Sequence, residues 1–507
     1  MNDSKKIRNN LILGILGQVV ALALGIVVPK LILDNYGSEV NGLLSSVTNI
    51  YAYIAIVEAG VAAASCQALY KTIANKDKAE TSAVLAATNK YYHRTGVIYF
   101  GLIVLFSVLY PILISSNIPY TTIVLVILFN GFGNIVNYFF HGKYLILLKA
   151  DGKNYIRTGL EMFTNAFKQI SKIVLISLGF DIVLVQFVAM LASFIQMLYI
   201  TYYIKKHYSW VDLKVKPNDK AISQSKNVFV HEINYLITAN VDTVLLTVFT
   251  TLKTVSVYAM YHLLFDMINR VLRTIRDSLE FKVAHAFHTD KKQFLRLFNA
   301  FETYYITLAF SLFTIAGFFV LPFLNLYTSG VDDINYIDKY LPYLFVAVNL
   351  LSAGRYTSEA MVHISGHFKQ TQNSAVIETV INIVSSVIFI NLWGIYGVLI
   401  GTVVSLLYRA NYLIIYVNKK IIGRSVWHTY RCWVLNFLIY IFLTSASNFI
   451  VLRLDSYFKI FLYCVPYAVV VLAVYFIINS ISDPQSFKLV YNILKRILNK
   501  VFKKIKV

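Results

Sequence analysis

Long apolar segments alternate with short polar ones along almost the whole chain. Between Leu11 and Asn479 about fourteen apolar runs are each long enough to cross the ~30 Å hydrocarbon core of a bilayer, which takes about 20 helical residues. Only helices and closed barrels satisfy their backbone hydrogen bonds in lipid, and runs of this length indicate helices. The pattern predicts an all-α polytopic membrane protein with spans near 11–33, 43–69, 95–115, 121–142, 158–179, 182–204, 227–251, 254–278, 297–323, 341–364, 371–392, 395–418, 432–451 and 457–480.

Positive charge gathers in alternate loops between these spans. Of the 46 Lys and Arg residues, the loops on one side of the membrane hold only Lys30, Lys253, Lys339, Arg453 and Lys459. Most of the others lie in the amino-terminal segment, the loops of the opposite side and the carboxy-terminal tail. Because cytoplasmic loops carry the Lys and Arg excess, both termini are predicted to be cytoplasmic.

Composition supports a lipid environment. The chain is 58% hydrophobic and 14% charged, with a mean hydropathy of +0.63. Its net charge of +21 lies in short loops next to anionic lipid headgroups, so we expect no nucleic-acid partner. The three cysteines, Cys66, Cys432 and Cys464, lie in or beside spans and support neither a disulfide framework nor a zinc site. The first apolar run is too long for a signal peptide and is predicted to be a retained span.

An internal repeat is visible at an offset of 214 residues, where the turn Ala150–Gly152 corresponds to Ile364–Gly366. Two spans further on, Tyr202, Lys205 and Lys206 in one copy correspond to Tyr416, Lys419 and Lys420 in the other. Each copy holds six spans in the same orientation, which predicts two parallel lobes of a transporter that move about a central site. The predicted parts are an N-terminal six-helix lobe (1–210), a C-terminal six-helix lobe (220–425), two additional helices (426–482) and a basic amphipathic cytoplasmic tail (483–507).

The fifth span carries a stripe of polar residues on one helical face. Arg157, Glu161, Asn165, Lys168 and Lys172 recur at helical spacing. Lys168 and Lys172 lie a turn apart near mid-depth, where their like charges repel each other. Carboxylates of other spans, such as Glu58, are one candidate set of partners. The alternative is that the two lysines bind an anionic substrate. We favour this alternative because charge deep in a membrane is usually functional.

Other charges within spans stand in pairs. Asp266 and Arg270 in the eighth span, and Arg355 and Glu359 in the tenth, are spaced four residues apart and are predicted to form ion pairs within their helices. Arg409 is predicted to extend to the cytoplasmic interface.

The seventh span has a second polar stripe. It consists of His231, Tyr235, Thr238 and Asp242. Asp242 could titrate during a transport cycle or accept hydrogen bonds from neighbouring hydroxyls, and the sequence leaves both open.

No catalytic signature is found, and neither a cofactor nor a metal is expected. The chain has no Gly-x-x-x-x-Gly-Lys phosphate loop, which argues against ATP hydrolysis. The segment His231–Tyr235 begins like a zinc-protease helix but has tyrosine in place of the second histidine. The acidic pair Asp332 and Asp333 is predicted to be a solvated turn.

Several motifs resemble those of the Wzx-type polysaccharide flippases of the MATE/MviN-like (MOP) transporter superfamily. They are Tyr36–Leu43, Glu58–Gly60, Ala68–Lys71, Tyr91–Arg94 and Asn240–Thr243. The resemblance implies twelve core helices plus two, and a substrate made of an oligosaccharide repeat unit on undecaprenyl pyrophosphate. It also implies the bacterial plasma membrane, membrane-lipid contacts, and a polysaccharide polymerase and chain-length regulator of capsule or exopolysaccharide synthesis as partners.

In this resemblance, basic residues of a central cavity accept the pyrophosphate. The positions that fit are Lys168 and Lys172, with Arg355 and Arg270 from the second lobe. Coupling or structural roles fall to the acids Asp242, Glu58, Asp266 and Glu359. One departure is that the first span has no carboxylate, whereas drug-exporting relatives commonly titrate one there.

Two alternatives remain open at this point. A multidrug or small-molecule antiporter of the same fold needs an anionic or aromatic cavity for cations, which the lysine pair disfavours. A membrane-bound polysaccharide polymerase needs a large exterior loop with catalytic side chains, whereas the longest exterior loop here runs only from Asn325 to Tyr340. The energy source is not indicated.

Overall fold

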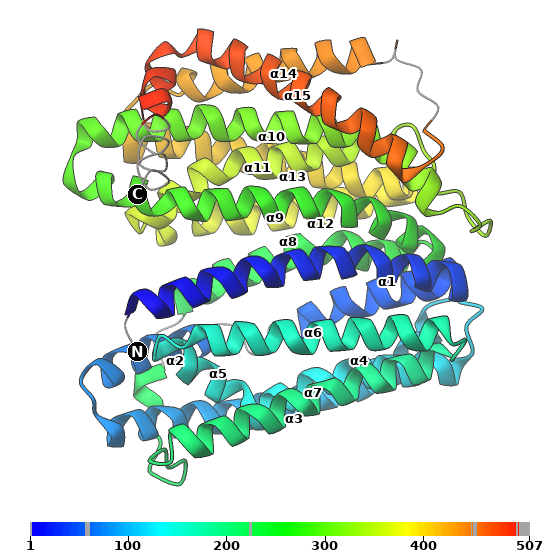
Figure 1. Cartoon of the computed structure of the whole chain (residues 1–507), viewed down its shortest axis with the longest axis vertical. Helices are drawn as coiled ribbons and strands as arrows, with labels where there is room; N and C mark the ends of the chain where they lie inside the picture. Colours follow the sequence, from blue (N-terminus) through cyan, green and yellow to red (C-terminus); the bar gives the residue numbers. More distant parts are fainter. Residues whose placement is uncertain are drawn as a thin grey trace, which may run out of the picture. The chain divides into compact units, whose positions relative to one another are not determined.

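The structure is a computed structural model, and its regular secondary structure is helical throughout the part that it describes (Figure 1). It describes the backbone of residues 3–55, 61–222, 226–447, 449, 454–492 and 495, and the side chains of these residues except 3–23, 63, 226–232, 235 and 281. Contacts divide the chain into unit 1, Met1–Ala259 with Gly330–Ile334, and unit 2, Met260–Ser329 with Asn335–Val507. This boundary falls at the eighth predicted span, and the partition into two six-helix lobes stays a prediction.

Unit 1 holds the first seven predicted spans. Two of them share α1, whose helical path is interrupted at Gly37 (φ 78°, ψ −179°), a conformation that favours glycine. The fourth span continues beyond its predicted end, through a π-helical segment, to Ala150. The elements are α1 (Asp3–Ile54), α2 (Val61–Ala74), α3 (Lys78–Leu113), α4 (Tyr120–Val136), η2 (Asn137–His141), α5 (Gly142–Ala150), α6 (Asn154–Ser177), α7 (Ile182–His207), η3 (Asp219–Ile222) and α8 (Lys226–Phe249).

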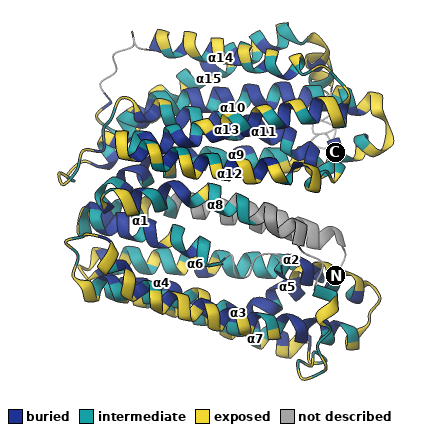
Figure 2. Ribbon diagram, turned by 180° about the vertical axis from the view of Figure 1, so that it is seen from behind, coloured by how far each residue is buried: buried dark blue, intermediate teal, exposed yellow. Residues whose placement is uncertain are grey.

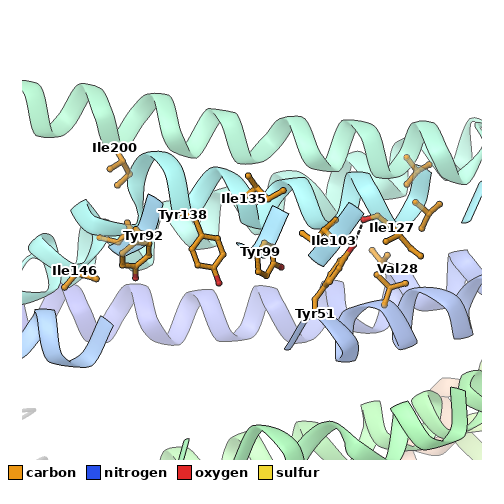
Figure 3. Packing of buried hydrophobic residues seen from close by; sticks show 14 of the residues in the cluster. Val28, Tyr51, Tyr92, Tyr99, Ile103, Ile127, Ile135, Tyr138, Ile146 and Ile200 are labelled. Carbon is orange, nitrogen blue, oxygen red and sulfur yellow. Dashed lines mark hydrogen bonds between the residues drawn. The ribbon is translucent and has the colours of Figure 1, made fainter. Parts of the chain in front are cut away.

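The core of unit 1 is rich in buried tyrosine. Helix α1 packs against α6 and α8, while α4 packs against both α3 and α7. Figure 3 shows Tyr51, Tyr92, Tyr99 and Tyr138 in a row between these helices. The rings of Tyr99 and Tyr138 are 4.8 Å apart between centroids, and the Tyr51 hydroxyl donates to the carbonyl of Ile127. Their apolar rings fill the core while most of their surface is removed from solvent.

Unit 2 contains the remaining long helices. Helix α10 packs against α11, α14 and α15, and α13 packs against α11 and α12. The elements are α9 (Leu252–Thr289), α10 (Lys291–Tyr327), α11 (Leu341–Ser365), α12 (Phe368–Trp393), α13 (Ile395–Tyr416), η4 (Val417–Ile422), α14 (Trp427–Ser447) and α15 (Tyr457–Ser482). The positions of the fourteen predicted spans therefore all coincide with helices, in whole or in part.

Helices α12 and α13 approach each other closely at two glycines. A Cβ on Gly397 would lie 2.6 Å from the backbone nitrogen of Ile390, and a Cβ on Gly401 would lie 2.6 Å from that of Ser386. Gly397 and Gly401 form a Gly-x-x-x-Gly pattern, which lets helix backbones meet in lipid. This contact fixes α13 against α12 with little side-chain volume between them.

Exposed residues recur along many helices, as the yellow bands of Figure 2 show, and many of them carry large apolar side chains. Leu113 is 73% exposed on α3, and Phe461 is 67% exposed on α15. A water-soluble protein would bury most such surface, whereas a lipid-facing one exposes it. Seven described helices are also long and apolar enough to cross a membrane. The protein is an all-α polytopic membrane protein, as predicted.

The two turns that anchor the sequence repeat have the same backbone geometry. Gly152 after α5 and Gly366 after α11 have φ angles of 69° and 72°. In both copies glycine supplies the left-handed residue that ends one helix and lets the next begin.

The carboxy-terminal tail is described only in its first part. Residues 484–492 are helical, and the backbone nitrogen of Ser486 donates to the Asp483 Oδ1 atom at 3.1 Å. Most of the predicted amphipathic stripe, including Ile497 and Val501, lies outside the described residues. Its interaction with the membrane surface stays a prediction.

Candidate functional site

Helix α6 exposes two different faces. Phe163, Phe167, Ile170 and Val174 form an exposed apolar face, as expected toward lipid. The predicted polar stripe occupies the opposite face, because its members stand about half a turn away at 100° per residue. The side chains of Arg157 and Glu161 are 36% and 37% exposed there, and Arg157 Nε lies 2.8 Å from Glu161 Oε1. A polar face left open in a membrane helix is expected to line a water-filled space.

Lys168 and Lys172 continue this polar face toward the end of α6. Both residues are half-buried. Among the residues whose side chains the structure describes, none forms an ion pair or a hydrogen bond with either ammonium group. Glu161, which is paired with Arg157, therefore does not neutralise them. Glu58, the acid considered as a partner, lies outside the described residues. The two lysines therefore present a pair of like charges that no described side chain neutralises.

The Lys168 side chain reaches toward α4 and α7. Its Nζ atom lies 4.0 Å from the position that a Cβ on Gly133 would occupy, and the hydroxyl of Ser193 lies 2.9 Å from the same position. Ser193 Oγ and Thr164 Oγ1 are buried, and neither has a hydrogen-bond partner in the described part of the chain. Hydroxyls beside a cation can donate to an anion that the cation attracts.

The structure adds two cationic or titratable residues that the sequence analysis missed. His141 and Lys143 are 2% and 6% exposed, and Lys143 lies in the helical continuation of the fourth span past its predicted end at residue 142. Lys143 Nζ donates to Asn89 Oδ1 at 2.6 Å, and the charges of Lys143 and Lys168 both act on the His141 ring. His141 ends a π-helical segment, a feature that is frequent at functional sites. A hydropathy window could not reveal this, since Lys143 stands at the boundary of the apolar run.

The predicted ion pair between Arg355 and Glu359 is wrong. Arg355 Nη1 instead donates to Glu378 of α12, and Arg409 Nε lies 3.3 Å from the other oxygen of the same carboxylate. Arg355, Glu378 and Arg409 are 9%, 5% and 4% exposed. The prediction that Arg409 extends to the interface is therefore also wrong, and its guanidinium additionally donates to Ser374 Oγ. One carboxylate thus joins α11, α12 and α13, which leaves Arg355 occupied rather than free for a substrate.

The predicted pair between Asp266 and Arg270 is present. Arg270 Nε lies 2.8 Å from Asp266 Oδ2, and Arg273 Nη2 lies 3.0 Å from Oδ1. Two guanidinium groups share one carboxylate, so the cluster keeps a positive charge. Arg270 is the more open of the two, with 45% of its side chain exposed. Arg270 is thus paired, like Arg355, but its side chain is far more exposed.

The remaining candidate acids are differently placed. Asp242 is 6% exposed, and its Oδ2 accepts a hydrogen bond from the hydroxyl of Tyr258 at 3.1 Å. Of the two roles that the sequence left open for Asp242, the structure shows that of hydrogen-bond acceptor. Glu359 is half-buried beside Arg355. The side chains of His231 and Tyr235 lie outside those described. In the described part of the chain, no group of three His, Cys, Asp or Glu residues could hold a metal ion.

The fold, unlike the sequence, has recognisable counterparts. No protein-family model and no curated protein matches the chain. Among solved structures, it is similar to a lipid II flippase, MurJ, in an inward-closed conformation, with a TM-score of 0.70 at 14% identity over 93% of this chain and 98% of that one.

Two further solved structures are MATE transporters. An inward-facing multidrug resistance transporter of the MOP superfamily gives a TM-score of 0.65 at 16% identity, covering 82% of this chain and 96% of that one. A Vibrio cholerae MATE transporter gives 0.56 at 13% identity, covering 84% and 98%. These likenesses span nearly the whole length of each counterpart. The chain therefore has the fold of MOP-superfamily transporters.

Proposed function

We propose that this protein is a flippase that moves an undecaprenyl-pyrophosphate-linked oligosaccharide from the cytoplasmic to the outer leaflet by alternating access. The observation that carries the proposal is the pair Lys168 and Lys172 on the open polar face of α6, with no partner among the described side chains. A cation pair at this depth suits a substrate with two adjacent phosphates. The MOP-superfamily fold supports a transporter, since helix bundles of this kind usually expose a central site to each side in turn.

The proposed binding step follows from the charges. Without substrate, the like charges of Lys168 and Lys172, one helical turn apart, repel each other. A diphosphate would relieve that repulsion and accept charge-assisted hydrogen bonds from both ammonium groups. Ser193, whose hydroxyl is buried without a hydrogen-bond partner in the described part of the chain, would add a donor. These residues do not indicate which oligosaccharide is carried.

The proposed setting follows from the same resemblance. A bacterial plasma membrane supplies the lipid-linked substrate, with both termini on the cytoplasmic side. A polysaccharide polymerase and a chain-length regulator would use the exported unit to build a capsule or exopolysaccharide.

The test is a charge-neutralised variant. Lys168→Gln with Lys172→Gln should leave a folded, membrane-inserted protein that binds undecaprenyl pyrophosphate roughly ten-fold or more weakly, since each charge-assisted hydrogen bond contributes about 1.5–3 kcal/mol. Binding is measured on the purified protein, and polymer export in a strain lacking the native gene. The double Arg variant should retain part of both activities, because the positive charge remains.

A matched control is available on α7. Lys205→Gln with Lys206→Gln removes the same number of charges from exposed positions at the end of that helix. This control should bind and export normally. If the Lys168 and Lys172 variant is well expressed and also exports at the normal rate, these lysines do not form the anion site.

A multidrug antiporter is the second candidate, because the MATE transporters share the fold. Such a protein binds cations, and the described polar face of α6 ends in two unneutralised ammonium groups. An antiporter would raise the resistance of a sensitive strain to cationic drugs and would not restore polymer production. A flippase would restore polymer production and would not raise resistance to cationic drugs.

A further inference from the structure

Unit 2 contains an apolar pocket outside the charged sites described above. It has a volume of about 290 Å³ and is lined by side chains of α9, α10, α15 and the helical start of the tail. The wall includes Leu279 and Val283 of α9, Phe301 of α10, Phe476 of α15, and Leu489 of the tail. The volume lies at the lower end of the range for ligand sites, which suits a slender chain rather than a bulky ring system.

The pocket lies near one membrane surface. Helices α9 and α10 have 38 and 37 residues and meet at Asp290. At 1.5 Å per residue each is about 55 Å long, so both extend well beyond a ~30 Å hydrocarbon core. The lining residues of α9 and α10 stand about 10 to 25 Å from the Asp290 turn by the same measure. This depth corresponds to the boundary between the hydrocarbon core and the headgroups, in the leaflet that the loop charges predict to be cytoplasmic.

The described lining contains a single charged residue, Lys282, which is exposed. Polar contacts around the pocket are otherwise internal, such as the Tyr304 hydroxyl 2.9 Å from Ser480 Oγ. The tail is fixed nearby, because Thr303 Oγ1 donates to Asp483 Oδ2 at 3.2 Å. The pocket is therefore an apolar slot with one exposed cation, Lys282, at its wall.

We propose that this pocket binds one acyl chain of an anionic phospholipid from that leaflet, with the lipid phosphate paired to Lys282. An apolar slot without an occupant would lose dispersion contacts along its walls. At the membrane surface the abundant occupant with an apolar chain and a negative head is an anionic phospholipid. The site is separate from Lys168 and Lys172 and does not depend on the substrate proposed above.

The test uses the full chain and two kinds of variant. Native mass spectrometry of the purified protein with phosphatidylglycerol or phosphatidylcholine measures how much of each lipid is retained. Ala300→Phe fills the pocket from α10 and should abolish retention of one phosphatidylglycerol. Lys282→Gln should lower the preference for phosphatidylglycerol over phosphatidylcholine roughly five-fold, corresponding to about 1 kcal/mol for a charge near the surface.

Matched controls separate the pocket from general effects. Val271→Phe places the same phenyl ring at an exposed position of α9 outside the pocket, and Lys292→Gln removes an exposed charge beside the Asp290 turn. Both controls should behave as the unmodified protein. Retention of phosphatidylglycerol by Ala300→Phe, or an unchanged lipid preference in Lys282→Gln, overturns the proposal. The proposal is also overturned if phosphatidylglycerol binds only after residues 493–507 are removed, because the chain's own tail would then be the occupant of the pocket.

Discussion

The carboxylate of Asp333 accepts two hydrogen bonds from Ser38, one from its Oγ at 2.5 Å and one from its backbone nitrogen at 3.1 Å. Ser38 follows the break at Gly37, so this carboxylate satisfies the first free amide of the second half of α1. Asp332 and Asp333 are both exposed, as predicted for a solvated turn, and the Asp333 carboxylate in addition anchors that turn to α1. Asp333 thereby ties the segment Gly330–Ile334 to α1 across 295 residues of chain.

Removing this cap should lower stability. Asp333→Ala is expected to cost about 1 kcal/mol, as for the loss of other helix caps, and to lower the thermal unfolding midpoint of the purified protein. Asp332→Ala, at the exposed neighbouring position, should have little effect. Equal shifts in the two variants would mean that the loss of negative charge, rather than the contact with Ser38, matters.

Glu378 is expected to be among the most sensitive positions of unit 2. Glu378→Ala leaves the buried guanidinium groups of Arg355 and Arg409 without their shared carboxylate, which typically costs about 3–5 kcal/mol. The yield of folded protein and its unfolding temperature should both fall. Glu161→Ala, which breaks the half-exposed pair with Arg157, should cost less than about 1 kcal/mol. A Glu378 variant as stable as the Glu161 variant would contradict the proposed structural role.

The contact between α12 and α13 predicts a strong steric effect. Gly401→Val would place its Cβ 2.6 Å from the backbone nitrogen of Ser386, so the helices must separate, at a cost of about 1–3 kcal/mol or more. Gly101→Val is the control, because a Cβ at that position of α3 meets nothing within 4 Å. Thermal unfolding of both variants measures the difference. Tolerance of Val at Gly401 would show that the two helices do not meet as described.

Membrane orientation can be measured with reporter fusions. The loop charges predict that a reporter after Val507, or near Lys214, lies in the cytoplasm, while one near Asp332 lies outside. Alkaline phosphatase and a fluorescent protein report opposite sides. Finding Asp332 and Lys214 on the same side would overturn both the number of spans and the parallel repeat.

Local patterns were enough to predict the helices. Hydropathy over about 20 residues locates a span, because each spanning helix satisfies its own backbone hydrogen bonds and faces lipid with apolar side chains. The turns at Gly152 and Gly366 could likewise be found, since each depends on a few neighbouring residues. The pairing of Asp266 with Arg270 followed from helical spacing alone, as both residues stand on one face of one helix.

The partners of other residues depended on contacts between helices. Spacing suggested Glu359 for Arg355, but the packing of α11 on α12 and α13 brings Glu378 between Arg355 and Arg409. Lys143 is buried because the fourth span continues as a helix beyond its predicted end, which hydropathy does not report. The sequence by itself determined which segments are helical and that Lys168 and Lys172 share a face, because those properties are local. Only the tertiary structure decided which charges are neutralised, because a carboxylate pairs with whatever cation the packing places within about 4 Å.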